Sequence, residues 1–204
     1  MKIVSFSENK NIEKRIAITP EVSKKYKSLG FEVALPRGYG LHLGFDDDQY
    51  KTNGASIVEN DKDLLVNSDV IVQLGLPSDE NLSQLKENQN LIGVLNPFLN
   101  KDKLETLSKK KINNFSLELL PRITRAQSMD ILSSQANLAG YKAVIESFAN
   151  FEKAIPMMMT AAGTVPAAKV LIVGAGVAGL QAIATAKRMG AIVFATDVRM
   201  ASKE

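Results

Sequence analysis

A glycine-rich turn that follows a short apolar run constrains the fold of this chain more than any other feature. Val170–Val173 has no polar alternation, as expected of a strand buried on both faces. The run leads directly into a turn of the form GxGxxG, and an amphipathic stretch follows. The turn, called the glycine turn below, consists of Gly174, Ala175, Gly176, Val177, Ala178 and Gly179. This order predicts a strand, a tight turn and a helix.

Each glycine of the turn has its own steric reason. Gly174 allows the tight turn, Gly176 lets a phosphate approach the backbone, and Gly179 lets the helix pack closely on the strand. A helix that opens near Val177 would direct free N–H groups and the positive end of its dipole toward an anion. The glycine turn therefore predicts a binding site for the pyrophosphate of a dinucleotide.

An acidic residue falls where such a unit binds the adenosine ribose. Gly190 ends the predicted helix, Ile192–Ala195 is predicted as the next parallel strand, and Asp197 follows it, about 20 residues past the glycines. A carboxylate there accepts from the ribose hydroxyls and repels a 2′-phosphate, which favours NAD(H) over NADP(H). We place Asp197 and the adjacent Val198 in the predicted cofactor site. Arg199 could pair with a 2′-phosphate, so the alternative stays open.

Strands and helices alternate along residues 1 to about 120. The signals include Thr19 as a helix N-cap, Pro20 at the first helical position and Gly30 at the helix end. Such alternation predicts a parallel, doubly wound sheet with helices on both faces. No glycine fingerprint falls in this half, so it is expected to lack a dinucleotide site of its own.

The predicted fold is therefore α/β, with two Rossmann-like domains joined by a long helix. The first domain covers residues 1–126, the helix covers 127–153, and a dinucleotide-binding domain begins at 154 and runs to 204. Two parallel strands bury too little surface to be stable alone. We therefore expect the second domain to be truncated and the chain to be a piece of a longer polypeptide.

Composition excludes several classes of protein. The chain has no cysteine and one histidine, which argues against disulfides and a metal site. The net charge of +3 lacks an aromatic-interleaved basic stripe, so nucleic acid is not an expected partner. Residues 155–186 hold few charges but contain two prolines and the glycine turn, so direct insertion into a membrane is not expected. The amino terminus is apolar for only a few residues before it becomes charged, which predicts a strand and not a signal peptide. The absence of cysteine fits a reducing, cytoplasmic setting.

A polar cluster lies at the junction of the two predicted domains. Its members, called the junction cluster below, are Arg122, Gln127, Asp130 and Ser133. A cleft between two α/β domains is a place where the reactive end of a dinucleotide would lie. Structural roles are equally compatible with the spacing: Thr124 and Gln127 have the form of a capping box, and Asp130 suits a helix amino terminus. The spacing alone leaves both interpretations open.

Longer segments carry a resemblance to a known family. They are RITRAQSMDILSSQANLAGY from Arg122, MMMTAAGTVPAAK from Met157, and GAGVAGLQAIATA from Gly174. They resemble the NAD(H)-binding alpha subunit of proton-translocating, Re/Si-specific NAD(P) transhydrogenases, within the alanine dehydrogenase/transhydrogenase family. The resemblance covers the whole chain and is densest from Pro121 onward.

The resemblance implies a function and partners. Such a component passes hydride from NADH to NADP⁺ held on a partner component, and a membrane-spanning component couples the transfer to proton movement. The junction cluster would then position the nicotinamide and its ribose. The full-length protein would be a homodimer in the cytoplasm, peripheral to the inner membrane through its partners. The 204-residue chain alone is expected to bind NADH weakly or not at all, and to be inactive.

Two alternatives remain. Alanine dehydrogenase is similar, including Arg15, its substrate-carboxylate residue, but that enzyme needs a lysine and a histidine where this chain has Gly75 and Asn96. The lone His42 is expected to be solvated, and Met157–Met159 to fill a core. A regulatory module that senses NAD(H) without turnover is the second alternative.

Overall fold

The computed structural model describes residues 1–200, and the chain divides into two compact units. The first unit is Met1–Met129, and the second begins at Asp130. The predicted dinucleotide-binding domain, 154–204, ends in four residues that lie outside the described part of the chain. The predicted division into domains remains a proposal.

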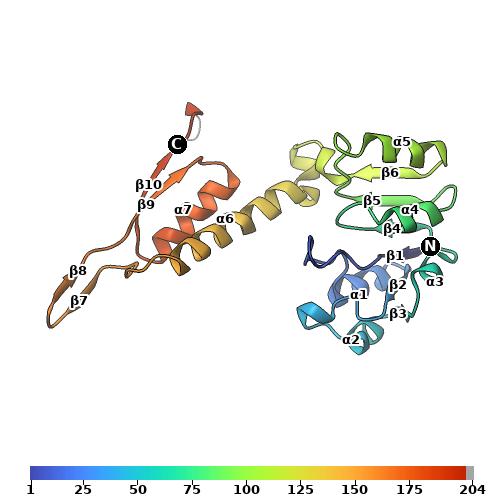
Figure 1. Ribbon diagram of the computed structural model, residues 1–204, viewed down its shortest axis with the longest axis horizontal. Coiled ribbons are helices and arrows are strands. Elements are labelled where there is room, and N and C mark those ends of the chain that lie inside the picture. Colours follow the sequence, from blue (N-terminus) through green and yellow to red (C-terminus); the bar gives the residue numbers. More distant parts are fainter. Residues whose placement is uncertain (201–204) are drawn as a thin grey trace. The chain divides into compact units, whose positions relative to one another are not determined.

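Six strands form one sheet in the first unit (Figure 1). All neighbouring strands are parallel, and their order is β3-β2-β1-β4-β5-β6. This is the strand order of a Rossmann fold, which confirms the predicted doubly wound sheet. The strands are β1 Lys2–Val4, β2 Glu32–Pro36, β3 Ala55–Val58, β4 Val70–Val72, β5 Asn90–Gly93 and β6 Asn113–Ser116.

Helices follow the strands in alternation. Thr19 caps α1 by accepting from the N–H of Val22, and Asp46 forms a capping box with Gln49 at α2. The α-helices are α1 Pro20–Ser28, α2 Asp47–Thr52, α3 Asp61–Leu65, α4 Asp79–Gln84 and α5 Lys101–Lys109. Short 3₁₀ helices are η1 Leu41–Leu43, η2 Leu117–Leu119 and η3 Thr124–Met129. Strand β6 ends at Ser116, and the chain turns directly into η2.

The core of the first unit has one layer on each face of the sheet. Ile3 packs in a cluster with Tyr39 and Tyr50, whereas its neighbour Val4 packs in a second cluster with Leu64. Successive side chains of a strand point to opposite faces, so both faces of β1 are covered. The central strands are buried and apolar for this reason.

Gln73 ties together the two strands at which the strand order reverses. It follows β4 directly and its side chain is 3% exposed. Its Oε1 accepts from the N–H of Phe6 at 3.1 Å, and its Nε2 donates to the carbonyl of Phe6 at 3.2 Å. The segment after β1 is thereby fixed beside the segment after β4.

Replacing Gln73 by leucine is expected to lower the free energy of unfolding of the first unit by about 1–3 kcal/mol, since Phe6 would keep two buried polar groups without partners. Urea unfolding followed by circular dichroism measures the change. Lys24→Leu, which adds the same side chain at an exposed position of α1, is the control and should unfold nearly as the wild type does. An unchanged midpoint for Gln73→Leu would show that water replaces both bonds.

The second unit contains two helices, a parallel strand pair and a hairpin. Helices α6 Ile131–Ala149 and α7 Val177–Arg188 pack against each other, and α7 packs on β9 Lys169–Val173 and β10 Ile192–Thr196. The hairpin of β7 Met158–Thr160 and β8 Gly163–Val165 projects away from the helices (Figure 1). The fold class is thus confirmed for both units, including the strand, glycine turn, helix and strand predicted from Val170 onward.

Two expectations about the second unit need correction, the bounds of the long helix and the burial of Met157–Met159. The helix predicted over 127–153 runs from Ile131 to Ala149, because Asp130 caps it and residues 124–129 form η3. Of the two N-cap candidates that the spacing left open, the cap is Asp130. Met157–Met159 do not fill a core: the three side chains are 60%, 44% and 80% exposed, since they lie on or beside the projecting hairpin. The hairpin itself was not predicted. Within residues 1–200, every helix is too short or too polar to cross a membrane.

Candidate functional site

The pairing of β9 with β10 brings the glycine turn and Asp197 to one edge of the strand pair. The two strands run parallel, in register from Lys169 opposite Ile192 to Val173 opposite Thr196. Gly174 follows β9 with φ +101°, and its N–H donates to the carbonyl of Thr196 at 2.7 Å. A positive φ of this kind favours glycine, so the turn depends on Gly174.

The other two glycines meet different surroundings. A Cβ on Gly179 would lie 1.8 Å from the carbonyl oxygen of Gly174, so helix α7 can approach β9 only without a side chain there. A Cβ on Gly176 would meet only the Nη2 atom of Arg199, at 3.6 Å. Gly176 therefore faces open space at the mouth of the turn. It is also the N-cap of α7, and no side chain caps that helix end.

The N-terminus of α7 is consequently available to an anion. The first N–H groups of a helix have no partner within the helix, and the dipole adds partial positive charge at this end. The glycine turn places Val177 and Ala178 in the first turn of α7, directly after Gly176. This geometry suits a phosphate group.

Asp197, directly after β10, binds the backbone of the glycine turn. Its Oδ2 accepts from the N–H of Ala175 at 2.7 Å, which links the second strand to the glycine turn. Both carboxylate oxygens also accept from Arg199: Oδ1 from the backbone N–H and from Nε, and Oδ2 from Nη2. Arg199 foremost, together with these backbone N–H groups, holds the pKa of Asp197 well below its usual range. The carboxylate is therefore ionised at neutral pH. The neighbouring Val198 is fully exposed.

The junction cluster is divided between the two units. Arg122 and Gln127 are exposed and belong to the first unit, Gln127 within η3. Asp130 and Ser133 belong to the second unit and contact each other: Asp130 accepts from the N–H of Ser133 at 2.9 Å and from its hydroxyl at 2.7 Å. The structure thus brings together two of the four predicted residues. Asp130 serves as the helix cap, one of the structural roles foreseen for it.

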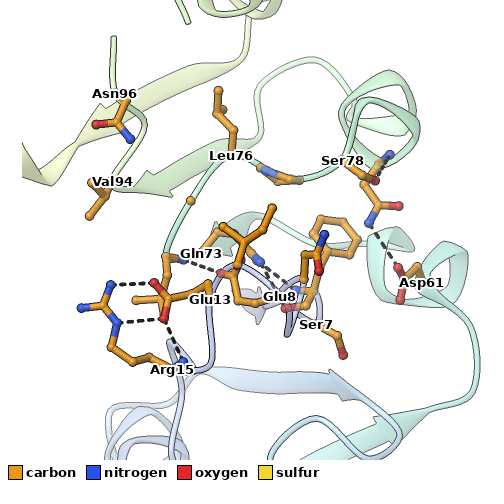
Figure 2. A pocket seen from close by; sticks show the side chains of 17 residues that line it. Ser7, Glu8, Glu13, Arg15, Asp61, Gln73, Leu76, Ser78, Val94 and Asn96 are labelled. Carbon is orange, nitrogen blue, oxygen red and sulfur yellow. Dashed lines mark hydrogen bonds and ion pairs between the residues drawn. The ribbon is translucent and has the colours of Figure 1, made fainter. Parts of the chain in front are cut away.

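A cavity of about 640 Å³ lies in the first unit at the carboxyl ends of its strands (Figure 2). Its walls come from the segments after β1, β4 and β5, where the strand order reverses. Ligands of open α/β sheets bind at such reversal points. Arg15, Gly75 and Asn96, the positions that the resemblance to alanine dehydrogenase singled out, all line this one cavity.

The charged groups of the cavity are engaged with protein partners. Figure 2 shows the guanidinium of Arg15 turned onto Glu13, to which Nε donates at 2.9 Å and Nη2 at 2.6 Å. This pairing lowers the pKa of Glu13 and raises that of Arg15. The carboxylate of Glu8 accepts from the N–H of Leu74 at 2.8 Å, and burial raises its pKa.

Two further expectations concern side chains away from these sites. His42 is exposed, and its Nε2 lies 2.7 Å from the carbonyl oxygen of Lys14, so the expectation that it is solvated is confirmed. Among the described residues, no cluster of His, Asp and Glu side chains could hold a metal ion. Sequence reasoning missed Glu8 and Gln73 as cavity residues, because only the strand order reveals that positions 66 residues apart meet.

A parallel β–α–β unit with an open glycine turn, an uncapped helix N-terminus and an ionised aspartate places the protein in the class of α/β proteins with a dinucleotide-type binding unit. The family model of the alanine dehydrogenase/PNT N-terminal domain matches residues 5–139, and that of the C-terminal domain matches residues 143–204. The chain belongs to the alanine dehydrogenase/PNT family.

Individual relatives agree with this assignment. The chain is 51% identical to an NAD(P) transhydrogenase alpha-subunit protein of Rhodospirillum rubrum, over the whole chain and 54% of that protein. It is 29% identical to an alanine dehydrogenase of Methanococcus maripaludis, over 94% of the chain and 52% of that enzyme. A crystal structure of transhydrogenase from Sinorhizobium meliloti superposes with a TM-score of 0.92 at 48% identity, covering 98% of the chain and 60% of that structure. The chain spans about half the length of the curated relatives it matches.

Proposed function

We propose that this chain is part of the NAD(H)-binding component of a proton-translocating NAD(P) transhydrogenase. The component would hold NADH while hydride passes to NADP⁺ on a partner component, and a membrane-spanning partner would couple the transfer to proton movement. The high identity to a transhydrogenase alpha subunit along the whole chain supports this assignment. The full-length protein would act as a homodimer, in the cytoplasm and attached to the inner membrane through these partners.

The residues that line the first-unit cavity carry the proposal, because they distinguish a transhydrogenase component from an alanine dehydrogenase. Oxidising an amino acid needs a group that removes a proton near neutral pH. Gly75 and Asn96 cannot do so, and the guanidinium of Arg15 is already paired with Glu13. The remaining carboxylates of the cavity, Glu8 and Asp61, accept hydrogen bonds from the N–H of Leu74 and from the side-chain amide of Asn81. The cavity is thus poorly equipped for alanine, whereas the open Gly176 and the uncapped N-terminus of α7 support dinucleotide binding at the glycine turn.

In this function the protein residues supply geometry and the cofactor supplies the hydride. The glycine turn and the N-terminus of α7 would hold the pyrophosphate, and Asp197 would accept from the adenosine ribose. The carboxylate already accepts four hydrogen bonds, so ribose hydroxyls would displace the exposed side chain of Arg199. Ionised Asp197 would repel a 2′-phosphate, which favours NADH over NADPH in this component.

The junction cluster would hold the nicotinamide half. Asp130 and Ser133 form a preorganised pair at the start of α6, with the carboxylate fixed by two bonds. Arg122 and Gln127, on the segment that precedes α6, would add a cation and an amide for the carboxamide and the ribose. A carboxylate held in this way by the N–H and the hydroxyl of Ser133 keeps its position when the cofactor binds.

The test uses the full-length protein mixed with its partner components. We expect NADH to reduce an NADP⁺ analogue in that mixture, and no NADH to form when alanine and NAD⁺ are supplied. Alanine-dependent formation of NADH would favour the alanine dehydrogenase alternative. NADH binding without hydride transfer, even with every partner present, would favour a module that senses NAD(H).

A further inference from the structure

Helix α6 approaches the glycine turn at a single residue that lacks a side chain. A Cβ on Gly140 would lie 2.0 Å from the carbonyl oxygen of Ala178 and 2.8 Å from its carbonyl carbon. Ala178 belongs to the first turn of α7, immediately before Gly179. The backbones of the two helices therefore touch at the turn where the phosphate would bind, and Gly140 is buried there.

The same face of α6 carries part of the junction cluster. Burial along α6 recurs every three or four residues, so one stripe of the helix faces α7. The stripe consists of Ser133, Ala136, Gly140, Val144 and Phe148. Ser133 lies seven residues from Gly140, about 10 Å along the axis at the rise of an α-helix. The Asp130–Ser133 pair is thus held at a fixed distance from the glycine turn, within one unit.

We propose, resting on the function above, that Gly140 is a positioning residue: its contact with Ala178 sets the spacing between the phosphate-binding turn and the Asp130–Ser133 pair. One bound NADH would span both places, with its phosphates at α7 and its nicotinamide ribose near the start of α6. The length of the dinucleotide is fixed, so a change in this spacing would release one end.

Adding a methyl group at Gly140 would force the helices apart. Cβ atoms do not come closer than 3.0 Å to such neighbours, so the separation at this point must grow by about 1 Å. Helix α7 and the carboxyl-terminal half of α6 share one cluster, in which Ala182 and Ala186 pack with Val144 and with residues of β9 and β10, so only the amino-terminal half of α6 is free to move. The amino-terminal half of α6 is mostly exposed, with Leu138 59% exposed. Helix α6 would therefore yield, while the glycine turn keeps its shape.

The experiment compares NADH with ADP, a probe that needs the glycine turn but not the junction cluster. For Gly140→Ala in the full-length protein, we expect the rate of hydride transfer to fall about 100-fold, since a misplacement of about 1 Å can cause such a loss. The affinity for NADH should fall about 10-fold, a loss of ~1.4 kcal/mol. The affinity for ADP should stay within about 2-fold of the wild type. Asn137→Ala, on an exposed part of α6, changes helix propensity similarly and should change neither affinity.

The outcomes test the positioning role of Gly140 and the proposed function separately. Equal losses of ADP and NADH affinity in a folded Gly140→Ala protein, or no loss of either, would overturn the positioning role. If Gly140→Ala does not fold, Ala136→Leu takes its place, since it adds bulk to the same stripe of α6 one turn nearer to Ser133. The affinity of this variant for NADH should fall while its affinity for ADP is kept. Unchanged affinity for NADH would overturn the proposal. Failure of the wild-type protein to bind either nucleotide would instead contradict the proposed function.

Discussion

Gly176→Ala in the full-length protein is expected to bind NADH about 100-fold more weakly than the wild type, a loss of ~2.7 kcal/mol, while its thermal stability falls only slightly, because alanine is a weaker N-cap than glycine. The reason is where the added methyl group would lie. Within the protein it would meet only the movable side chain of Arg199, at 3.6 Å. Toward a ligand it would occupy the place where the pyrophosphate approaches the backbone. Titration of NADH fluorescence and a thermal melt measure the two quantities.

Two other glycines provide matched controls for this prediction. A Cβ on Gly75 in the first unit meets no atom within 4 Å, so Gly75→Ala should change neither NADH affinity nor stability. Gly179→Ala should lose both, because its Cβ would lie 1.8 Å from the carbonyl oxygen of Gly174. If Gly176→Ala bound NADH as tightly as the wild type, the glycine turn would not hold the pyrophosphate.

Local sequence signals predicted most of the fold because each depends on nearby residues. Helix α1 begins at Pro20 after its Thr19 cap, as expected, and α7 ends just before Gly190. The glycine turn was predictable because Gly174, Gly176 and Gly179 answer steric demands that arise within one strand-turn-helix segment. Asp197 was also found, because its distance along the chain from the turn reflects one helix and one strand.

Features that depend on distant contacts were not predictable in the same way. A glycine within a helix lowers helix propensity, so the sequence around Gly140 gives no reason for it. The close contact of α6 with the backbone of Ala178 explains why this position has no side chain. Gln73 gains meaning from the pairing of β1 with β4, which sequence spacing does not specify. The start of α6 was misplaced by a few residues, because Thr124 and Asp130 both suit an N-cap and only the backbone decides between them.

The cavity shows how a site can be predicted incompletely. The resemblance to alanine dehydrogenase singled out Arg15, Gly75 and Asn96, and the structure places all three on one cavity. The pairing of Arg15 with Glu13 was not foreseen, although the two residues are close in sequence. An ion pair between neighbours depends on how the loop turns, and the sequence does not specify that turn.

Asp130→Asn is expected to slow hydride transfer about 100-fold while the affinity for NADH changes only a few-fold. A loss of rate without a matching loss of affinity is expected when the interaction removed acts mainly in the transition state. Asparagine keeps an oxygen that can accept from the N–H of Ser133, and it is as good an N-cap as aspartate, so α6 should remain intact. What the substitution removes is the negative charge that we propose lies beside the nicotinamide ribose. Stopped-flow transfer from NADH to an NADP⁺ analogue, with all components present, measures the rate.

The loss should be specific to this helix cap. Asp46 caps α2 through the N–H of Gln49 in the same manner, at 2.7 Å, so Asp46→Asn makes the same chemical change in the first unit and should leave rate and affinity unaltered. Arg122→Ala should resemble Asp130→Asn, because the two opposite charges are proposed to hold the same half of the cofactor. Equal losses of rate and affinity in Asp130→Asn would reduce Asp130 to a binding or folding group. A selective loss of rate would instead mean that a carboxylate fixed by its own helix amino terminus orients the nicotinamide for transfer.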